Sequence, residues 1–195
     1  MSPKKNRSVF LISLVLLALV AMTIGLKPRV AHASEGLLLK GTFTVQAELL
    51  TTITTCAPGD ANCAECLNNA GIFVDAHGIG ETSLGPLAFQ ILKCFNPAGG
   101  SFGTYAGTFT MTAPNGVDSL TGTYSGQNDN AGDAYGFGPF SGKLTVTHAT
   151  GKFSGAQGSD TFTAQAGPFT VGPNPDTAML MAFYSVRGNI ALPNH

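Results

Sequence analysis

Residues 147–162 read T-H-A-T-G-K-F-S-G-A-Q-G-S-D-T-F, and the pattern in and around them indicates the class of fold. Polar and apolar side chains alternate on both sides of the central part of this stretch, at residues 143–147 and at residues 161–165. Alternation with a period of two is typical of a strand with one buried face. The connection between these strands contains three glycines and two apolar side chains: Gly151, Phe153, Gly155, Ala156 and Gly158. Because glycine adopts turn conformations at little cost, we expect a compact connection that buries the Phe153 ring beneath the sheet.

Part of this stretch resembles a signature of a known family. Residues 150–158, T-G-K-F-S-G-A-Q-G, resemble the T-G-x-F-x-G-A-x-G signature of the allene oxide cyclase barrel-like superfamily, which includes plant allene oxide cyclases, dirigent proteins and secreted bacterial proteins. Weaker pieces agree in order at residues 78–85, 107–110 and 118–126. The resemblance covers roughly residues 38–190 and implies a β-barrel. The plant cyclases use a glutamate, an asparagine and a bound water, but the surrounding motifs are not recognisable here, so the resemblance implies the fold and not the activity.

The composition also indicates an all-β protein. The chain has 195 residues with 25 glycines and 13 phenylalanines, and only 11% of its residues are charged. Short strands separated by turns at regular spacing are typical of sandwiches and barrels. We expect strands at about 38–50, 72–82, 86–95, 104–113, 118–125, 138–148, 160–166 and 177–188. Eight antiparallel strands can close into a barrel, which removes the edges of the sheet.

Two strands carry particular expectations about their faces. In the third, Leu87, Phe89 and Ile91 are predicted to face the core, with Lys93 on the opposite face and Leu92 breaking the alternation. The last strand, residues 178–186, is apolar on both faces. A strand buried on both sides has this pattern. Its second face is therefore predicted to be buried within the monomer, to receive a terminal segment, or to contact a second copy of the chain.

The first 33 residues have the features of a secretory signal peptide. Lys4, Lys5 and Arg7 precede an apolar run at residues 9–26, and residues 31–33 form an A-x-A cleavage site. We expect cleavage after Ala33 and a mature chain that is secreted to the periplasm or the exterior; an uncleaved membrane anchor is the alternative. Residues 34–195 are then one barrel domain.

Removing this segment makes the protein acidic. Five of the 10 basic residues lie in residues 1–33, but none of the 11 acidic residues does, so the mature chain has a formal net charge of −6. Nucleic-acid binding requires a basic surface, which this chain lacks. Binding to an anionic membrane surface is disfavoured for the same reason.

The cysteines predict disulfide bonds. The four of them are Cys56, Cys63, Cys66 and Cys94. An even number in an exported chain favours two disulfides, with the Cys63–Cys66 pairing slightly disfavoured because its loop is tight. A zinc site or a redox C-x-x-C motif fits the spacing and setting less well. Three of the cysteines lie in an insertion at residues 56–70, where Asp60 is expected to cap a short helix, and we expect the insertion to cover one mouth of the barrel.

Other patterns give little support to catalysis or metal binding. Residues 99–103 match G-x-S-x-G, but a nucleophile elbow requires a following helix, and a strand is predicted there. Residues 128–133 are rich in Asn and Asp, but they lack the glutamate and flanking helices of an EF-hand. His77 and His148 have no acidic partner that the spacing fixes. We expect no metal and no cofactor.

Glu48 and Glu81 are the weak catalytic candidates. They belong to two neighbouring predicted strands, and either can point into the lumen. A buried carboxylate has a shifted pKa and can act as an acid or base. The preferred hypothesis is nevertheless a binding protein for a small apolar ligand, or an extracellular interaction module. The alternative is an isomerase, cyclase or dirigent-like enzyme acting on a hydrophobic substrate in the lumen.

Overall fold

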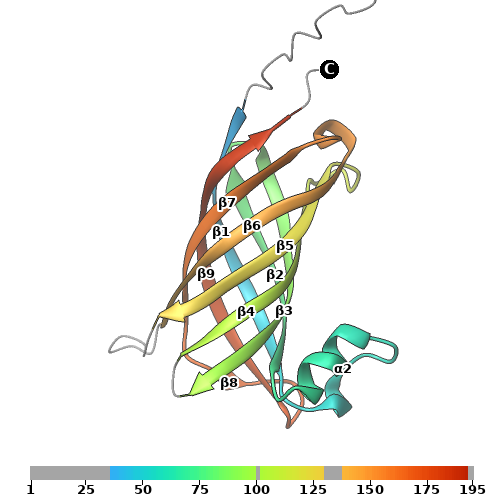
Figure 1. The fold of residues 1–195 in the computed structure, drawn as a ribbon, viewed down its shortest axis with the longest axis vertical. Coiled ribbons are helices and arrows are strands. Elements are labelled where there is room, and N and C mark those ends of the chain that lie inside the picture. Colours follow the sequence, from blue (N-terminus) through green and yellow to red (C-terminus); the bar gives the residue numbers. More distant parts are fainter. Residues whose placement is uncertain (1–35, 100–101, 130–137, 193–195) are drawn as a thin grey trace, which may run out of the picture. The chain divides into compact units, whose positions relative to one another are not determined.

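The structure is a computed structural model that describes residues 36–99, 102–129 and 138–192, and within these ranges the chain forms an antiparallel β-barrel (Figure 1). Its strands are β1 (Gly36–Leu50), β2 (Ile72–Thr82), β3 (Gly85–Gly99), β4 (Phe102–Thr112), β5 (Ser119–Asp129), β6 (Gly138–Thr150), β7 (Gln157–Ala166), β8 (Thr170–Val171) and β9 (Thr177–Ala191). Its helices are η1 (Ile53–Thr55), α2 (Ala61–Asn68) and η2 (Gly151–Phe153).

The barrel closes through its first and last strands. Each strand from β1 to β6 pairs with the next, β7 pairs with β9, and β9 pairs with β1 along its full length. The two-residue β8 pairs with β9 only at Ala178 and Met179. Closure leaves none of the eight long strands with an unpaired edge, which removes the sites where another chain could add a strand. The predicted eight-stranded barrel is therefore confirmed.

Aromatic and aliphatic side chains fill the middle of the barrel. Alternate residues of every long strand point inward, as period-two patterning requires. The ring centroids of Phe43 and Phe89 lie 4.7 Å apart, and those of Tyr124 and Phe162 lie 4.9 Å apart. A lumen packed in this way is a hydrophobic core.

The connection between β6 and β7 closes one end of this core. Phe153 is 2% exposed, so its ring is buried, as predicted, and Ala156 is also buried, at 3% exposed. The turn needs glycine because Gly151 and Gly155 have φ angles of +58° and +78°, where a side chain is strained. Figure 1 shows this connection at the upper end of the barrel, opposite the end that carries α2.

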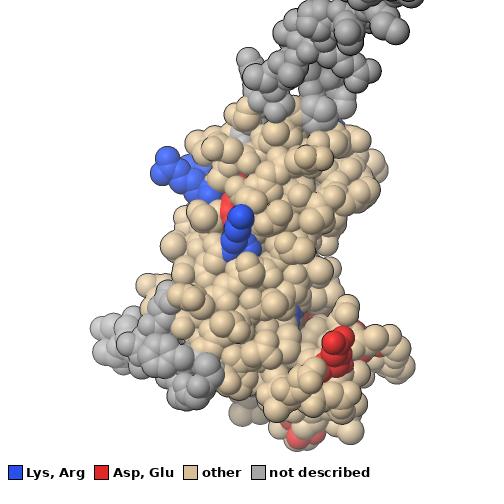
Figure 2. Space-filling model, in the orientation of Figure 1, with Lys and Arg blue, Asp and Glu red and all other residues tan. Residues whose placement is uncertain are grey.

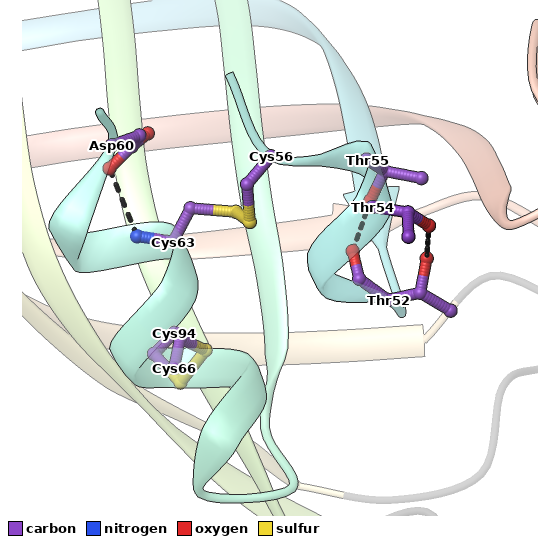
Figure 3. The surroundings of a disulfide bond; sticks show 8 residues. All are labelled: Thr52, Thr54, Thr55, Cys56, Asp60, Cys63, Cys66 and Cys94. Carbon is purple, nitrogen blue, oxygen red and sulfur yellow. Dashed lines mark hydrogen bonds between the residues drawn. A yellow bond between two sulfur atoms is a disulfide. The ribbon is translucent and has the colours of Figure 1, made fainter. Parts of the chain in front are cut away.

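The insertion after β1 forms a capped helix pinned by two disulfides. The Asp60 side chain accepts a hydrogen bond from the Cys63 backbone N–H at 3.0 Å, which confirms the predicted cap. Disulfide bonds join Cys56 to Cys63 and Cys66 to Cys94 (Figure 3). The prediction of two disulfides within the chain is confirmed.

The insertion does not cover the mouth of the barrel, and that prediction was wrong. Cys63 and Cys66 of α2 pack with Leu50, Phe73 and their neighbours in a cluster separate from the barrel core. The side chains that receive the helix come from the end of β1 and from the outer faces of β2 and β3. The cause is the Cys66–Cys94 disulfide, which holds α2 against the outside of β3.

We expect the two disulfides to contribute unequally to stability. The bridges close segments with sequence separations of 28 (Cys66–Cys94) and 7 (Cys56–Cys63). The chain-entropy model gives about 3.5 kcal/mol for the longer loop and about 2.5 kcal/mol for the shorter one. Replacing each pair with alanine and measuring denaturant unfolding should therefore show the greater loss without Cys66–Cys94. Equal losses, or a greater loss without the shorter bridge, would contradict this account.

The outer wall of the barrel is sparsely charged. Figure 2 shows a broad face that is almost without Lys, Arg, Asp and Glu, with acidic side chains gathered over the α2 insertion. On β9, Met181 and Phe183 are 43% and 49% exposed, so the outer side of this strand is not buried within the described monomer. Of the three expectations for this face, burial within the monomer is therefore wrong. The predicted signal peptide and its cleavage site lie outside the described residues; within the described part of the chain, no helix is long and apolar enough to cross a membrane.

Candidate ligand-binding cavity

A cavity of about 440 Å³ enters the end of the barrel that lies opposite the Phe153 connection. It is lined where β1, β3, β5 and β7 end and where β2, β4, β6 and β9 begin. The walls are mostly apolar and include Ala47, Leu49, Val74, Leu180 and Ala182. The lining residues farthest into the barrel are Lys93, Phe140 and Tyr184, so the cavity ends on a lysine.

Lys93 is enclosed by aromatic side chains from four other strands. It is 5% exposed, and its Nζ lies 3.3 Å from the Tyr124 hydroxyl and 3.4 Å from the Tyr184 hydroxyl. The same nitrogen lies 4.0 Å from the centroid of the Tyr105 ring and 4.9 Å from that of Phe140. These contacts stabilise an ammonium through cation–π attraction and two long hydrogen bonds, but they supply no negative charge.

Burial changes the pKa values of this cluster. Desolvation lowers the pKa of Lys93 from 10.5 to about 7, because removal from water disfavours the charged amine. Desolvation also raises the pKa of Tyr105 to about 12, and it raises the pKa values of Tyr124 and Tyr184. At neutral pH the site therefore combines phenols that stay protonated with an amine of which a large fraction is neutral.

No carboxylate balances Lys93 among the described residues. The ion pairs in this part of the chain are His77 with Asp75 and Lys152 with Asp118, and neither involves the buried lysine. Asp160 is a second buried ionisable side chain without a counter-ion in the described structure. It is 1% exposed, and neither of its carboxylate oxygens has a hydrogen-bond partner there. Burial raises the pKa of Asp160 to about 6.

Asp160 is remote from the cavity. It pairs with Gly188 on β9, four residues beyond Tyr184. That separation is roughly 13 Å along the strand. Asp160 therefore belongs to the packed core and does not contribute to the cavity, even though both buried groups face the interior.

A larger hollow of about 1340 Å³ lies along the outer wall of the barrel. Outward side chains such as Thr42, Ile79, Ala88 and Phe183 line much of it, and Ile79 is 74% exposed. Its size does not make it the better site, because it follows the open surface. The smaller cavity enters the barrel and contacts a buried ionisable group, which are the features expected of a ligand site.

Neither predicted catalytic glutamate points into the lumen, and that expectation was wrong. Ala47 and Leu49 on either side of Glu48 are buried, so the alternation of β1 turns Glu48 outward. Glu81 is exposed and follows the outward positions of β2. The side chain of His77 is 63% exposed, and that of His148 is also exposed. The described structure does not bring these residues together as a catalytic group.

Parts of the G-x-S-x-G match and of the Asn- and Asp-rich loop lie outside the described residues. Gly100 and Ser101 of the match are among them, and the residues that follow form β4 and not a helix. Residues 130–133 of the Asn- and Asp-rich loop lie outside them as well. Over the part of the chain that is described, no three His, Cys, Asp or Glu side chains are grouped so that they could hold a metal ion.

Sequence reasoning placed Lys93 on the wrong face of its strand. Leu87, Phe89 and Ile91 are buried in the core as predicted, and Lys93 continues the same face. The adjacent Leu92 hid this continuation, because its apolar side chain packs outward beside the insertion. Strict counting in steps of two from Ile91 would have identified Lys93 as an inward lysine.

Comparisons of this chain with protein-family models, with curated proteins and with solved structures found no match. The assignment of function therefore rests on the cavity and its chemistry.

Proposed function

We propose that this protein binds a small apolar molecule in the cavity that ends on Lys93. The observation that carries the proposal is the combination of about 440 Å³ of mostly apolar cavity with one buried amine at its inner end. Ligand sites are commonly apolar concavities of roughly 300–1,000 Å³ with a few polar groups that fix orientation. Lys93 and the hydroxyl of Tyr184 are such groups at the inner end of this cavity.

The stability of the surrounding barrel supports this assignment. Packed aromatic rings fill the centre of the barrel, and the Phe153 connection closes the opposite end. The cavity walls are therefore held by a rigid core, which favours binding because little ordering has to accompany it. We extend the proposal to a secreted protein of the allene oxide cyclase barrel-like type, supported by the N-terminal pattern and by the resemblance at residues 150–158.

We do not extend it to an isomerase or cyclase. That alternative required an inward carboxylate in an open lumen, whereas Glu48 and Glu81 face outward and the buried Asp160 lies away from the cavity.

Binding can be tested with the neutral fluorophore 1-aminoanthracene, whose emission rises in apolar surroundings. Ala166 is a half-buried residue on the cavity wall, and Ala166→Phe should fill the space without removing Lys93. We expect the purified protein to bind the probe with one-to-one stoichiometry, and the variant to weaken binding at least about tenfold, a loss of about 1.4 kcal/mol.

The matched control is Ala88→Phe, which adds the same ring on the outer face of β3, within the external hollow. This variant should bind the probe as the unmodified protein does. If Ala88→Phe abolishes binding and Ala166→Phe does not, the ligand site is the external hollow and the proposal is wrong. Absence of saturable binding by the unmodified protein would also contradict it.

A further inference from the structure

We infer that Lys93 forms an imine with an apolar aldehyde that enters the cavity at the end of the barrel. The inference rests on the proposed binding function and names the class of ligand. Its basis is a juxtaposition: a primary amine at the inner end of an apolar cavity, with phenol hydroxyls beside it and no carboxylate paired with it in the described structure.

The amine has the surroundings of a nucleophilic lysine. Desolvation in an apolar pocket increases the fraction of neutral amine, and only the neutral form has the lone pair that attacks a carbonyl. The lowered pKa of Lys93 supports this argument, since about 7 is close to neutral pH. A carboxylate partner would have the opposite effect and keep the amine protonated.

The neighbouring groups fit the remaining steps of the reaction. The Nζ lone pair attacks the carbonyl carbon, and the oxygen takes up a proton to give a carbinolamine. Loss of that oxygen as water then leaves a carbon–nitrogen double bond, so one aldehyde and one amine give one imine and one water. The Tyr184 and Tyr124 hydroxyls, 3.4 and 3.3 Å from Nζ, remain protonated and can donate hydrogen bonds to the departing oxygen.

The surroundings also favour the product. A protonated imine is a cation, and the Tyr105, Tyr124 and Phe140 rings have centroids 4.0, 4.8 and 4.9 Å from Nζ. Those rings can stabilise it without a counter-ion. Apolar walls limit the access of water, which would hydrolyse the imine.

An apolar aldehyde fits this site better than an apolar acid. A buried carboxylate needs several strong donors to replace its hydration, and pairing it with one buried ammonium leaves much of the desolvation cost unmet. The polar side chains of the lining are one lysine, two tyrosines and Asn128, with no arginine among the described lining residues. An uncharged carbonyl avoids this cost.

The test is reductive trapping with decanal. The purified protein is incubated with decanal and cyanoborohydride at about pH 7, and the product is analysed by intact mass and peptide mapping. We expect a mass gain of one decyl group, with Lys93 labelled at least about tenfold more than any exposed lysine, because ordinary lysines are almost fully protonated at this pH. Lys93→Met should lose this label, whereas Lys152→Met, which removes a half-exposed lysine, should retain it.

Two further measurements separate the possible failures. Ala166→Phe retains Lys93 but fills the cavity, so it should lose the label; if labelling persists, the aldehyde does not enter through the cavity and the inference is wrong. Decanoic acid and decanol are titrated as competitors of 1-aminoanthracene in the unmodified protein. If the fluorophore binds but Lys93 is not labelled, the imine is excluded while the binding function stands. If decanoic acid then binds at least tenfold more tightly than decanol and depends on Lys93, the ligand class is an acid.

Discussion

Replacing Phe153 with alanine should reduce the free energy of unfolding by about 3–5 kcal/mol, which is the usual cost of truncating a buried phenylalanine. The ring is 2% exposed and belongs to the same core cluster as Val146 and Phe162, the neighbours predicted from the sequence. The backbone around it is tightly held, since the Ala156 N–H donates to the Phe153 carbonyl at 2.8 Å. Collapse into the space left by the ring is therefore restricted. Denaturant unfolding gives the difference directly.

Two variants in the same connection serve as comparisons. Lys152→Ala should change stability by less than about 1 kcal/mol, because the Lys152 side chain is half exposed and its Nζ lies 3.7 Å from Asp118 Oδ2, which is long for an ion pair. The Lys152 backbone N–H, which donates to Asp118 Oδ1 at 2.9 Å, is retained in that variant. Gly155→Val should destabilise, since it forces a β-branched residue to a φ angle of +78°. If Phe153→Ala unfolds like Lys152→Ala, the connection does not close the core.

Lys93 should make the protein more stable as the pH rises from about 7 towards 10. The folded-state pKa is lowered from 10.5 to about 7, so in this window the unfolded chain binds the proton that the folded chain has lost. Stability rises with pH wherever the unfolded state binds more protons, and the full shift corresponds to about 4–5 kcal/mol, of which roughly 3 falls between about pH 7 and pH 9.5. Lys93→Met should remove this rise.

The measurement is the difference between the two unfolding curves at each pH, because other groups titrate as well. Asp160 affects stability in a different pH range. Because its pKa is raised, the free energy of unfolding falls as the pH rises from about 4 to 6. Above about pH 10 the tyrosines with raised pKa values lower the free energy of unfolding, which opposes the effect of Lys93. The two proteins are therefore compared only below that pH. A difference between Lys93→Met and the unmodified protein that is constant from pH 7 to about 9.5 would show that Lys93 is not desolvated.

Much of the fold was predictable because its signals are local. Period-two alternation located all eight long strands, and Asp60 before a short polar-apolar segment located α2. Which residues of a strand face the core is harder to predict where two apolar residues are adjacent, as at Ile91 and Leu92 in β3. One of them packs into the core and the other packs outward beside the insertion. That outer contact depends on the Cys66–Cys94 pairing, and the sequence leaves more than one pairing open.

The class of fold, the two disulfides and the burial of Phe153 could all be predicted from the sequence, because each follows from residues close together in the chain or from counting. The site could not, because it forms only when distant strands come together. The amine of Lys93 on β3 meets rings and hydroxyl groups from β4, β5, β6 and β9, up to 91 residues away in the chain. A lysine has its ordinary pKa in water and a very different one in an apolar cage, and barrel closure forms that cage.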